Sequence, residues 1–95
     1  MITNTLLIKL KERNQESIEK AKAVLLSMEG KIEVLRGMQV KEDIRRGESS
    51  YDILLITHFS TMEDMESYLL NPFHIEVSKY IAGVLESGAS VCFEK

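Results

Sequence analysis

The sequence is poor in the residues that build the most specific functional motifs. Its 95 residues include one cysteine, one proline, two histidines and no tryptophan. A single cysteine excludes an internal disulfide framework and suits a reducing compartment, so we expect a cytoplasmic protein. Two histidines and one cysteine are a weak basis for a metal centre, and the chain has no glycine-rich phosphate loop and no paired-cysteine motif. We therefore expect no metal and no cofactor.

Long apolar runs and an excess of positive charge are missing as well. No uninterrupted apolar stretch approaches the roughly 20 residues that a membrane helix needs. The first ten residues lack the apolar core and the cleavage site of a signal peptide. A net charge of −3 argues against nucleic acid, which favours a concentrated basic patch. We expect neither a membrane nor a nucleic acid among the partners.

The remaining composition is that of an ordinary globular chain, with 44% apolar and 28% charged residues. Residues 1–95 are too few for a second core, so we expect one domain. A chain of this size buries only roughly 60–65% of its unfolded surface, which limits its stability unless it oligomerises.

Hydrophobic periodicity predicts an α+β chain in the order β-α-β-β-α-β. The expected strands are 2–11, 33–41, 51–59 and 89–94, and the expected helices are 14–28, 60–70 and 72–86. Gly30 and Gly88 are the expected helix ends, and Ser60 with Glu63 has the form of a capping box. This order is that of the ferredoxin-like fold, with a four-stranded antiparallel sheet.

The third strand, Tyr51–Phe59, carries apolar side chains on both of its faces. One face holds Ile53, Leu55, Thr57 and Phe59, and the other holds Leu54, Ile56 and His58. A strand that is apolar on both faces is buried on both faces. The helices of so short a chain cover one side of the sheet, so we expect a second copy of the same sheet on the other side. The sequence therefore predicts a homodimer.

The single proline marks a break between two helices, in the stretch Tyr68–His74. Asn71 can cap a helix that begins at Pro72, because the fixed φ and missing N–H of proline suit the first helical position. His74 then lies in the first turn, where unpaired N–H groups and the helix dipole disfavour a positive imidazole. A neutral His74 can act as a base, and Tyr68 as a phenol donor, at the mouth of an apolar pocket. Alternatively, both side chains only hold the turn in place.

Three other polar groups have simple structural interpretations. We expect Cys92 to be a small buried strand residue, His58 to be a packed and hydrogen-bonded interface residue, and Arg45 and Arg46 to be solvated loop charges. The sharper alternatives are a reactive thiol, a pH-sensitive contact between two copies and an anion site.

Four segments together resemble the stress-responsive A/B barrel (Dabb) family of the dimeric α+β barrel superfamily. Asn4–Lys11, Gly37–Val40 and Tyr51–Ser60 resemble the first three strands of that family. Tyr68-Leu-Leu-Asn-Pro-Phe-His74 resembles its Tyr-x-x-x-Pro-x-His stretch and is the most specific of the four. The resemblance covers nearly the whole chain. It implies a ferredoxin-like monomer whose sheet packs against that of a second copy to form an α+β barrel.

The resemblance also implies a range of functions, most of them unassigned. One family member is a plant polyketide cyclase that forms olivetolic acid by an intramolecular aldol condensation, another is a plant protein that assembles into a heat-stable ring, and related barrels include small monooxygenases that need no cofactor. In the cyclase, the histidine at the position of His74 is the general base and the tyrosine at the position of Tyr68 assists it. Here Asn4 stands in place of the family's first-strand histidine and cannot supply a titratable nitrogen. Aliphatic residues such as Val24 occupy the region of the cyclase's helix tyrosine.

These observations predict a pocket between the sheet and the helices that binds a small apolar or aromatic molecule. His74 and Tyr68 are the catalytic candidates. The expected ligand-binding residues come from the first and third strands: Asn4, Leu6, Ile8, Leu55, Thr57 and Phe59. The first functional hypothesis is a binding protein or a cofactor-free enzyme of the cyclase or monooxygenase kind. The alternatives are a non-catalytic dimeric stress or scaffold protein, in which the His/Tyr pair is structural, and a regulatory module.

Overall fold

The structure is a computed structural model that describes residues 1–94. Within these residues the chain forms four strands and three helices: β1 (Ile2–Leu10), α1 (Gln15–Leu26), β2 (Gly37–Glu42), β3 (Ile53–Phe59), α2 (Met62–Leu70), α3 (Pro72–Val84) and β4 (Leu85–Glu94). The second helical segment of the fold is thus divided into α2 and α3, which are separated only by Asn71.

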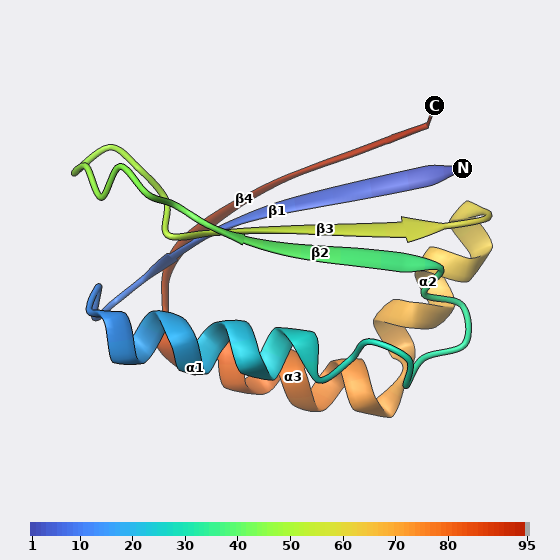
Figure 1. Cartoon of the computed structure of the whole chain (residues 1–95). Helices are drawn as coiled ribbons and strands as arrows, with labels where there is room; N and C mark the ends of the chain where they lie inside the picture. Colours follow the sequence, from blue (N-terminus) through green and yellow to red (C-terminus); the bar gives the residue numbers. More distant parts are fainter. Residues whose placement is uncertain (95) are drawn as a thin grey trace.

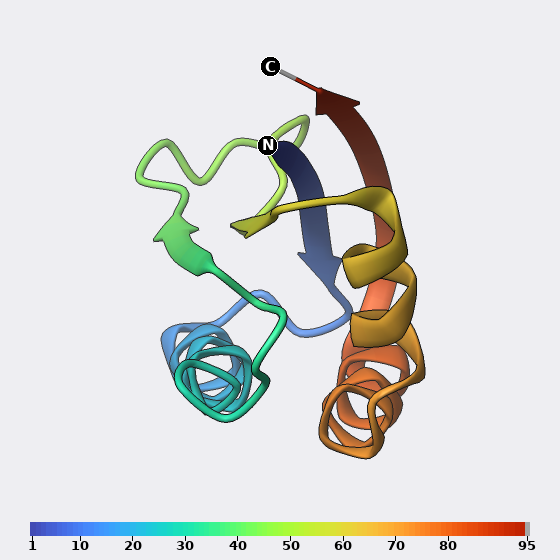
Figure 2. The same cartoon turned by 90° about the vertical axis from the view of Figure 1, so that its right-hand side faces the viewer.

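The strands form an antiparallel sheet in the order β2-β3-β1-β4. In Figures 1 and 2, α1 and α3 lie side by side under one face of this sheet, and α2 stands at one end of it. The order of the elements and the order of the strands are those of the ferredoxin-like fold. The predicted α+β fold is therefore confirmed.

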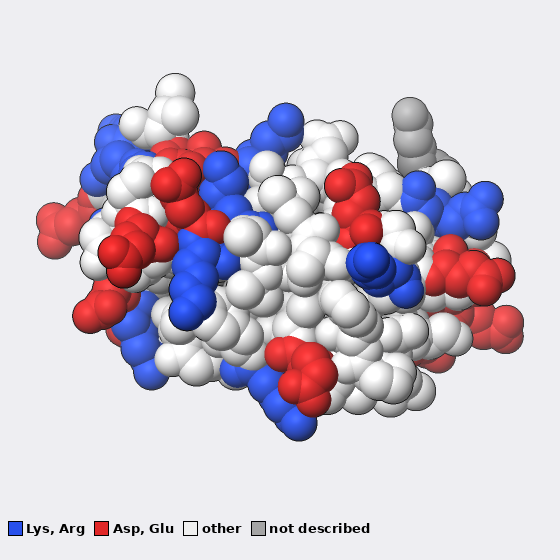
Figure 3. Space-filling view, turned by 60° about the horizontal axis from the view of Figure 1, so that its bottom comes forward, with Lys and Arg blue, Asp and Glu red and all other residues white. Residues whose placement is uncertain are grey.

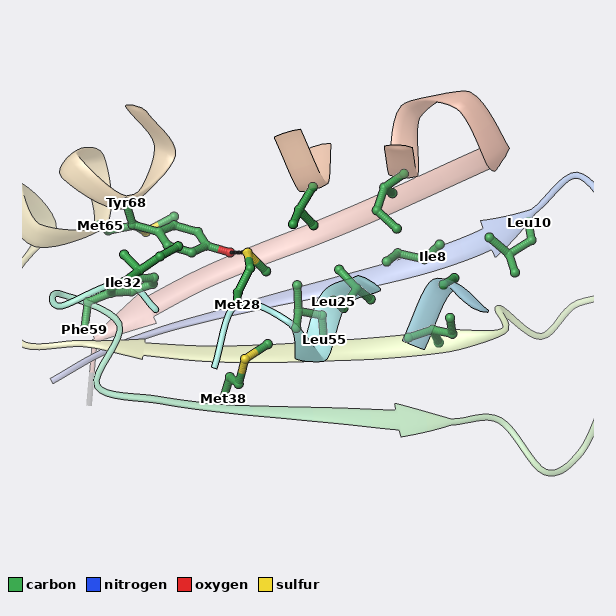
Figure 4. Close-up of a cluster of buried hydrophobic side chains, with 14 of the residues drawn as sticks. Ile8, Leu10, Leu25, Met28, Ile32, Met38, Leu55, Phe59, Met65 and Tyr68 are labelled. Atoms are coloured by element: carbon green, nitrogen blue, oxygen red, sulfur yellow. Dashed lines mark hydrogen bonds between the residues drawn. The ribbon is translucent and has the colours of Figure 1, made fainter. Parts of the chain in front are cut away.

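The core lies between the helices and the face of the sheet that they cover. The period-2 pattern of β3 buries Ile53, Leu55, Thr57 and Phe59, which all point toward the helices. The other strands and the helices add further buried side chains: Ile2, Ile8, Leu10, Ile18, Ala21, Leu25, Met38, Met65, Val77 and Ile81. Figure 4 shows part of this cluster, in which Met28 and Ile32 of the segment after α1 meet Met65 and Tyr68 of α2 over the sheet.

The opposite face of the sheet has no helix over it in the part of the chain that is described (Figure 2). The register aligns Thr3, Thr5 and Leu7 of β1 with His58, Ile56 and Leu54 of β3 and with Phe93, Val91 and Ala89 of β4. We call these nine residues the open face. Leu7, Val91 and Phe93 are 38%, 63% and 49% exposed, so the chain by itself leaves a broad apolar surface in water.

Local signals explain where the helices begin, with one correction. Asn14 caps α1, as its Oδ1 accepts the N–H of Ser17 at 2.8 Å. The cap of α2 is Thr61, whose Oγ1 accepts the N–H of Asp64 at 3.1 Å, so the capping box predicted from Ser60 is one residue early. Both Ser and Thr can cap, and the sequence pattern alone does not decide between adjacent ones.

The predicted second strand begins too early. Residues 32–35 form a turn, which the N–H of Leu35 closes on the carbonyl of Ile32 at 3.1 Å, and β2 begins only at Gly37. Val34 and Leu35 pack against the core from this turn without joining the sheet. The alternation of apolar residues at 33–36 therefore indicates that these side chains pack against the core, and not that they belong to a strand.

The predicted end of the last helix is also wrong. α3 ends at Val84 and the chain passes directly into β4, so Gly88 lies inside a strand and not at a helix end. A Cβ at Gly88 would lie 3.3 Å from the carbonyl oxygen of Leu7, which shows that the glycine permits a close approach to β1. Cys92 is exposed on this edge strand, with its Sγ 3.5 Å from Met65 Sδ, so the prediction of a buried cysteine is wrong too.

A buried ion pair fixes the β2–β3 loop to the start of α1. Asp52 is almost fully buried and accepts the N–H of Leu10 at 2.8 Å and the Nε–H of Arg13 at 2.9 Å. Arg13 also donates to the carbonyls of Gly47 and Ser50, at 3.0 and 2.9 Å. These bonds satisfy both charges and hold the loop against the end of the sheet. Arg46 of the same loop binds Glu42, so it is paired and not a free cation.

Charges of both signs are interspersed over the side of the molecule shown in Figure 3. Lys22 and Arg46 both pair with Glu42, and Lys79 pairs with Glu76. The hydrogen bond from Lys22, followed by smaller contributions from Gln15 and Arg46, holds the pKa of the Glu42 carboxyl below its usual value. This surface thus consists of mixed ion pairs, not of a field of one sign.

Candidate functional site

The helix break positions the two candidate side chains. Asn71 ends α2 by donating its N–H to the carbonyl of Tyr68 at 3.1 Å, and it begins α3 by accepting the N–H of Phe73 on its Oδ1 at 2.8 Å. Pro72 occupies the first turn of α3, as predicted. The turn therefore places Tyr68, near the end of α2, beside His74, in the first turn of α3.

The rings of Tyr68 and His74 lie against each other. Their centroids are 4.3 Å apart with a tilt of 48°, and the centroid of the Tyr68 ring also lies 4.9 Å from that of Phe59. Tyr68 is only 3% exposed, and its hydroxyl reaches across the core to donate to Met28 Sδ at 3.7 Å (Figure 4). A thioether sulfur is a weak acceptor, so this phenol proton is only loosely held.

The hydrogen bonds of His74 decide which of its ring nitrogens is the base. Nδ1 lies 3.2 Å from the carbonyl oxygen of Leu69, and a carbonyl can only accept, so Nδ1 carries the proton of the neutral ring. Nε2 is then the unprotonated nitrogen, and it lies 3.3 Å from Ser78 Oγ. This tautomer turns the lone pair of His74 toward Ser78.

Both rings are shifted toward their neutral forms. Burial lowers the pKa of His74, and the hydrogen bond to the Leu69 carbonyl offsets this only in part. Burial likewise raises the pKa of Tyr68 to about 12. At neutral pH the pair is therefore a free imidazole base beside a protonated phenol, a combination suited to removing one proton and donating a hydrogen bond nearby.

An apolar cavity adjoins the pair. Its volume is about 160 Å³ and it is partly open to solvent. It lies between the sheet, α1 and α3, and its lining consists of Leu6, Leu25, Met28, Leu55, Tyr68, His74, Val77, Ser78, Ile81, Ala82 and Leu85. Apart from His74, none of these side chains carries a charge near neutral pH, so the cavity suits an uncharged molecule.

The family model of the stress responsive A/B barrel domain matches residues 2–95. This chain belongs to that family. The match covers almost the entire sequence and confirms the resemblance seen in the strands and in the Tyr-x-x-x-Pro-x-His stretch. No curated protein matches the sequence.

Solved structures similar to this A/B barrel chain share its fold throughout. A dimeric protein of unknown function with a ferredoxin-like fold from Bacteroides fragilis has a TM-score of 0.83 at 25% identity, over 99% of this chain and 95% of that chain. A hydroxynitrile lyase from Passiflora edulis has a TM-score of 0.82 at 11% identity, over 97% and 90%. An antibiotic biosynthesis monooxygenase has a TM-score of 0.77 at 9% identity, over 100% and 98%. The last two likenesses show the fold alone.

The structure of this A/B barrel chain brings together some of the predicted site residues. Tyr68, His74, Leu6 and Leu55 line the cavity. The other strand residues of the predicted set, Ile8, Thr57 and Phe59, are buried in the core outside that lining.

Asn4 is half-buried on the face of β1 that carries Leu6, and it is not part of the cavity lining. Its strand partners are Thr57 and Cys92, and Cys92 in turn contacts Met65 of α2. Asn4 therefore lies under the α2 end of the sheet, whereas the cavity lies mainly under α1 and α3 and meets α2 at Tyr68.

Sequence reasoning about this A/B barrel chain missed Ser78 and Met28. Ser78 lies one helical turn after His74, and the i,i+4 spacing was a usable signal for their contact. Met28 reaches Tyr68 from the turn after α1, across 40 residues of sequence, and only the tertiary fold brings them together.

Other features of the described residues are less suited to chemistry. Larger hollows of about 350 and 280 Å³ lie beside Leu10 and beside Leu7, but neither is lined by a histidine. Within residues 1–94, no group of three or more His, Cys, Asp or Glu side chains is placed to hold a metal ion. Nor does that part of the chain have a helix long and apolar enough to cross a membrane.

Proposed function

We propose that this A/B barrel protein is a homodimer in which each copy binds a small uncharged molecule in the cavity beside His74. The observation that carries this proposal is the pairing of a neutral imidazole with a protonated phenol at the wall of an apolar cavity. In the proposed site, His74 removes a proton from the ligand or binds its hydroxyl, and Tyr68 donates a hydrogen bond to a ligand oxygen.

The size and lining of the cavity favour a ligand of about one ring. A cavity of about 150 Å³ lined by aliphatic side chains holds one benzene molecule, and this one is about 160 Å³. Its sheet and helix walls are aliphatic, so an apolar ring or short chain would displace little bound water there. A carboxylate would lose its hydration without a cation to pair with, which disfavours charged ligands.

The chemistry that fits such a site is proton removal from a carbon next to a carbonyl group, without a cofactor. His74 would take the proton, and the Tyr68 phenol would stabilise the negative charge that develops on the carbonyl oxygen. Cyclisation by aldol chemistry and oxygenation of an electron-rich ring both begin with a proton removal of this kind. The resemblance links the first reaction to a cyclase of the family and the second to monooxygenases among related barrels, and we propose chemistry of this class here.

Ligand binding can be tested with simple probes. We expect phenol to shift the amide NMR signals of Val77 and Ile81 more strongly than benzene, and benzoate to shift them least. Ala82→Phe, which places a ring at the cavity wall, should abolish the phenol shifts. The matched variant Ala23→Phe, at an exposed position of α1, should leave them intact. Equal shifts from phenol and benzoate, or shifts that survive Ala82→Phe, would count against binding in this cavity.

The proposal of a homodimer is based on the open face of the sheet. Its exposed apolar residues, among them Val91 and Phe93, lie on a sheet surface that no described helix covers, and the similar protein from Bacteroides fragilis is dimeric. A second copy of the same face would remove these side chains from water.

Sedimentation velocity at micromolar concentration tests the dimer. We expect the mass of two chains for the wild type and of one chain for Val91→Lys, because the substitution places a charge in the interface. Leu70→Lys, at a residue of α2 that is 76% exposed, is the matched control and should remain dimeric. A wild-type protein that sediments as a monomer would contradict this part of the proposal.

A second function is favoured by a specific observation. Both ring nitrogens of His74 already have partners, Leu69 and Ser78, and Tyr68 is nearly inaccessible. Such satisfied and inaccessible side chains fit a non-catalytic stress-response or scaffold dimer, in which the His/Tyr pair serves only to hold the α2–α3 turn. Absence of phenol binding together with a strong loss of stability in His74→Ala would favour that function. In either case the cytoplasm is the proposed location, on the basis of the single cysteine.

A further inference from the structure

The basic nitrogen of His74 faces the hydroxyl group of a serine. Nδ1 is committed to the Leu69 carbonyl at 3.2 Å, so Nε2 carries the lone pair, and the atom facing it is Ser78 Oγ at 3.3 Å. A helix serine without another role commonly bonds the carbonyl one turn before it, but this hydroxyl is turned to the imidazole of that earlier residue. The group that His74 is placed to deprotonate in this structure is therefore Ser78.

A nucleophile, a base and a group that orients the base are linked here through consecutive polar contacts, from the Ser78 hydroxyl through the His74 imidazole to the Leu69 carbonyl. Nucleophilic sites that use serine need a base within hydrogen-bonding reach of the hydroxyl, and a third group that holds the base in the right tautomer. The Leu69 carbonyl holds His74 as that third group, in place of the carboxylate found in many triads. The contact of 3.3 Å is slightly long, as is common before a substrate is bound.

The surroundings supply room for an acyl group and a donor for its oxygen. Ser78 lines the apolar cavity of about 160 Å³ together with Val77 and Leu6, and its side chain is otherwise exposed. A short acyl chain can enter the cavity while the leaving alcohol and the attacking water stay on the solvent side. Tyr68 also lines this cavity, and its hydroxyl donates to a thioether sulfur, a weak acceptor, so its proton is available to the oxygen of a carbonyl group bound there.

We propose that Ser78 is a nucleophile activated by His74, and that the cavity accepts the acyl group of small uncharged esters. This inference rests on the assignment of His74 as the base in the proposed function. In the first half of the reaction, Ser78 Oγ bonds to the ester carbonyl carbon, its proton passes to His74 Nε2, and the bond to the alcohol oxygen breaks as that oxygen takes the proton. In the second half, water attacks the acyl-serine, His74 accepts its proton and returns it to Oγ, and a carboxylic acid leaves. Ester and water are thus converted to acid and alcohol.

The test uses 4-nitrophenyl acetate with the full chain. We expect a burst of 4-nitrophenol and acetylation on the peptide that contains Ser78, found by mass spectrometry. Ser78→Ala should abolish both, and His74→Gln should slow acetylation by about 10²-fold, the usual contribution of a positioned base. Ser67→Ala, at an exposed serine of α2, is the matched control and should react like the wild type. The rate should rise with pH and reach a plateau once His74 is neutral.

The outcomes separate this inference from the proposed function. Acetylation on lysines only would contradict the assignment of Ser78 as the nucleophile. So would acetylation at Ser78 at a rate that His74→Gln leaves unchanged, because His74 would then not activate the serine. If phenol still binds the cavity in that case, the binding function stands and His74 acts on the ligand directly. If neither acetylation nor phenol binding occurs, both proposals fail. Circular dichroism of each variant excludes loss of fold as the cause.

Discussion

The two ends of the molecule hold buried polar groups of opposite character. At the β2–β3 loop end, Asp52 and Arg13 are both charged, and short hydrogen bonds of 2.8 to 3.0 Å satisfy them. At the α2–α3 end, Tyr68 and His74 are both neutral, and their bonds are long, 3.7 Å to sulfur and 3.2 and 3.3 Å on the imidazole. Figure 1 shows the loop and α2 at opposite ends of the sheet.

The difference indicates which end is structural and which is available for chemistry. The carboxylate oxygens of Asp52 and the donors of Arg13 are taken up by each other and by loop and strand backbone, so a ligand would have to break bonds that hold the fold. Tyr68 and His74 adjoin a cavity and have weakly engaged protons and lone pairs, so a ligand can replace their partners at little cost. The comparison can be tested by altering each end and measuring both stability and phenol binding.

The largest effect is expected at the loop end. Asp52→Ala should lower the free energy of unfolding by about 3–5 kcal/mol, because it leaves the half-buried Arg13 guanidinium without its counter-charge and the N–H of Leu10 without its acceptor. Urea unfolding measures this loss, and Glu48→Ala, at an exposed carboxylate of the same loop, is the control. Phenol binding by the folded fraction should not change. A loss below about 1 kcal/mol would show that the ion pair is not the main support of the loop.

The next largest effect on stability is expected from removing either of two helix caps, one at each end of the molecule. Asn71→Ala and Asn14→Ala each remove a cap that accepts a backbone N–H at 2.8 Å, and each should cost about 1 kcal/mol in urea unfolding. Only Asn71→Ala should also weaken phenol binding, because Asn71 sets the turn between Tyr68 and His74. Equal phenol affinities for the two variants would show that the cap does not position the site.

The sequence was sufficient for the fold because its signals are local and repeated. The two apolar parities of Tyr51–Phe59 and the Asn-Pro break after Leu70 each gave an element that the structure contains. Gly88 could not be placed in this way, since a glycine after an apolar helix pattern fits a helix end and a close strand contact equally well. Only the tertiary position of Leu7, behind Gly88, decides between them.

The site was only partly predictable, because some of its contacts have local signals and others depend on tertiary packing. His74 and Tyr68 flank a local break, and Ser78 follows at helical spacing, so all three are accessible to local reasoning. The Asp52–Arg13 pair joins residues 39 positions apart and has no local signal. Asn4 lies on the predicted face of β1 but under α2, because the face of a strand follows from alternation while the helix above it depends on packing.

A smaller effect distinguishes the Tyr68 hydroxyl from its ring. Tyr68→Phe should change the free energy of unfolding by less than about 1 kcal/mol, because the lost partner is a thioether sulfur that needs no replacement. The same change should weaken phenol binding several-fold if the hydroxyl contacts the ligand. Tyr80→Phe, at a tyrosine of α3 outside the cavity lining, is the control for both measurements. Unchanged phenol affinity in Tyr68→Phe would leave the ring, and not its hydroxyl, as the contribution of this residue.

The smallest effect is the pH dependence that His74 gives to stability. Burial makes its pKa lower in the folded chain than the usual 6.5, so the unfolded chain binds a proton more readily between these two values. Stability is therefore complete above about pH 6.5 and declines as pH falls through that range to the folded pKa. His74→Gln should lack this part of the decline, so the difference in unfolding free energy between wild type and variant should shift in favour of the variant on going from pH 8 to pH 5. A difference that does not depend on pH would mean that His74 is not kept neutral by the fold. Its assignment as the base would then lose its physical support, and the two ends of the molecule would no longer differ in the way proposed.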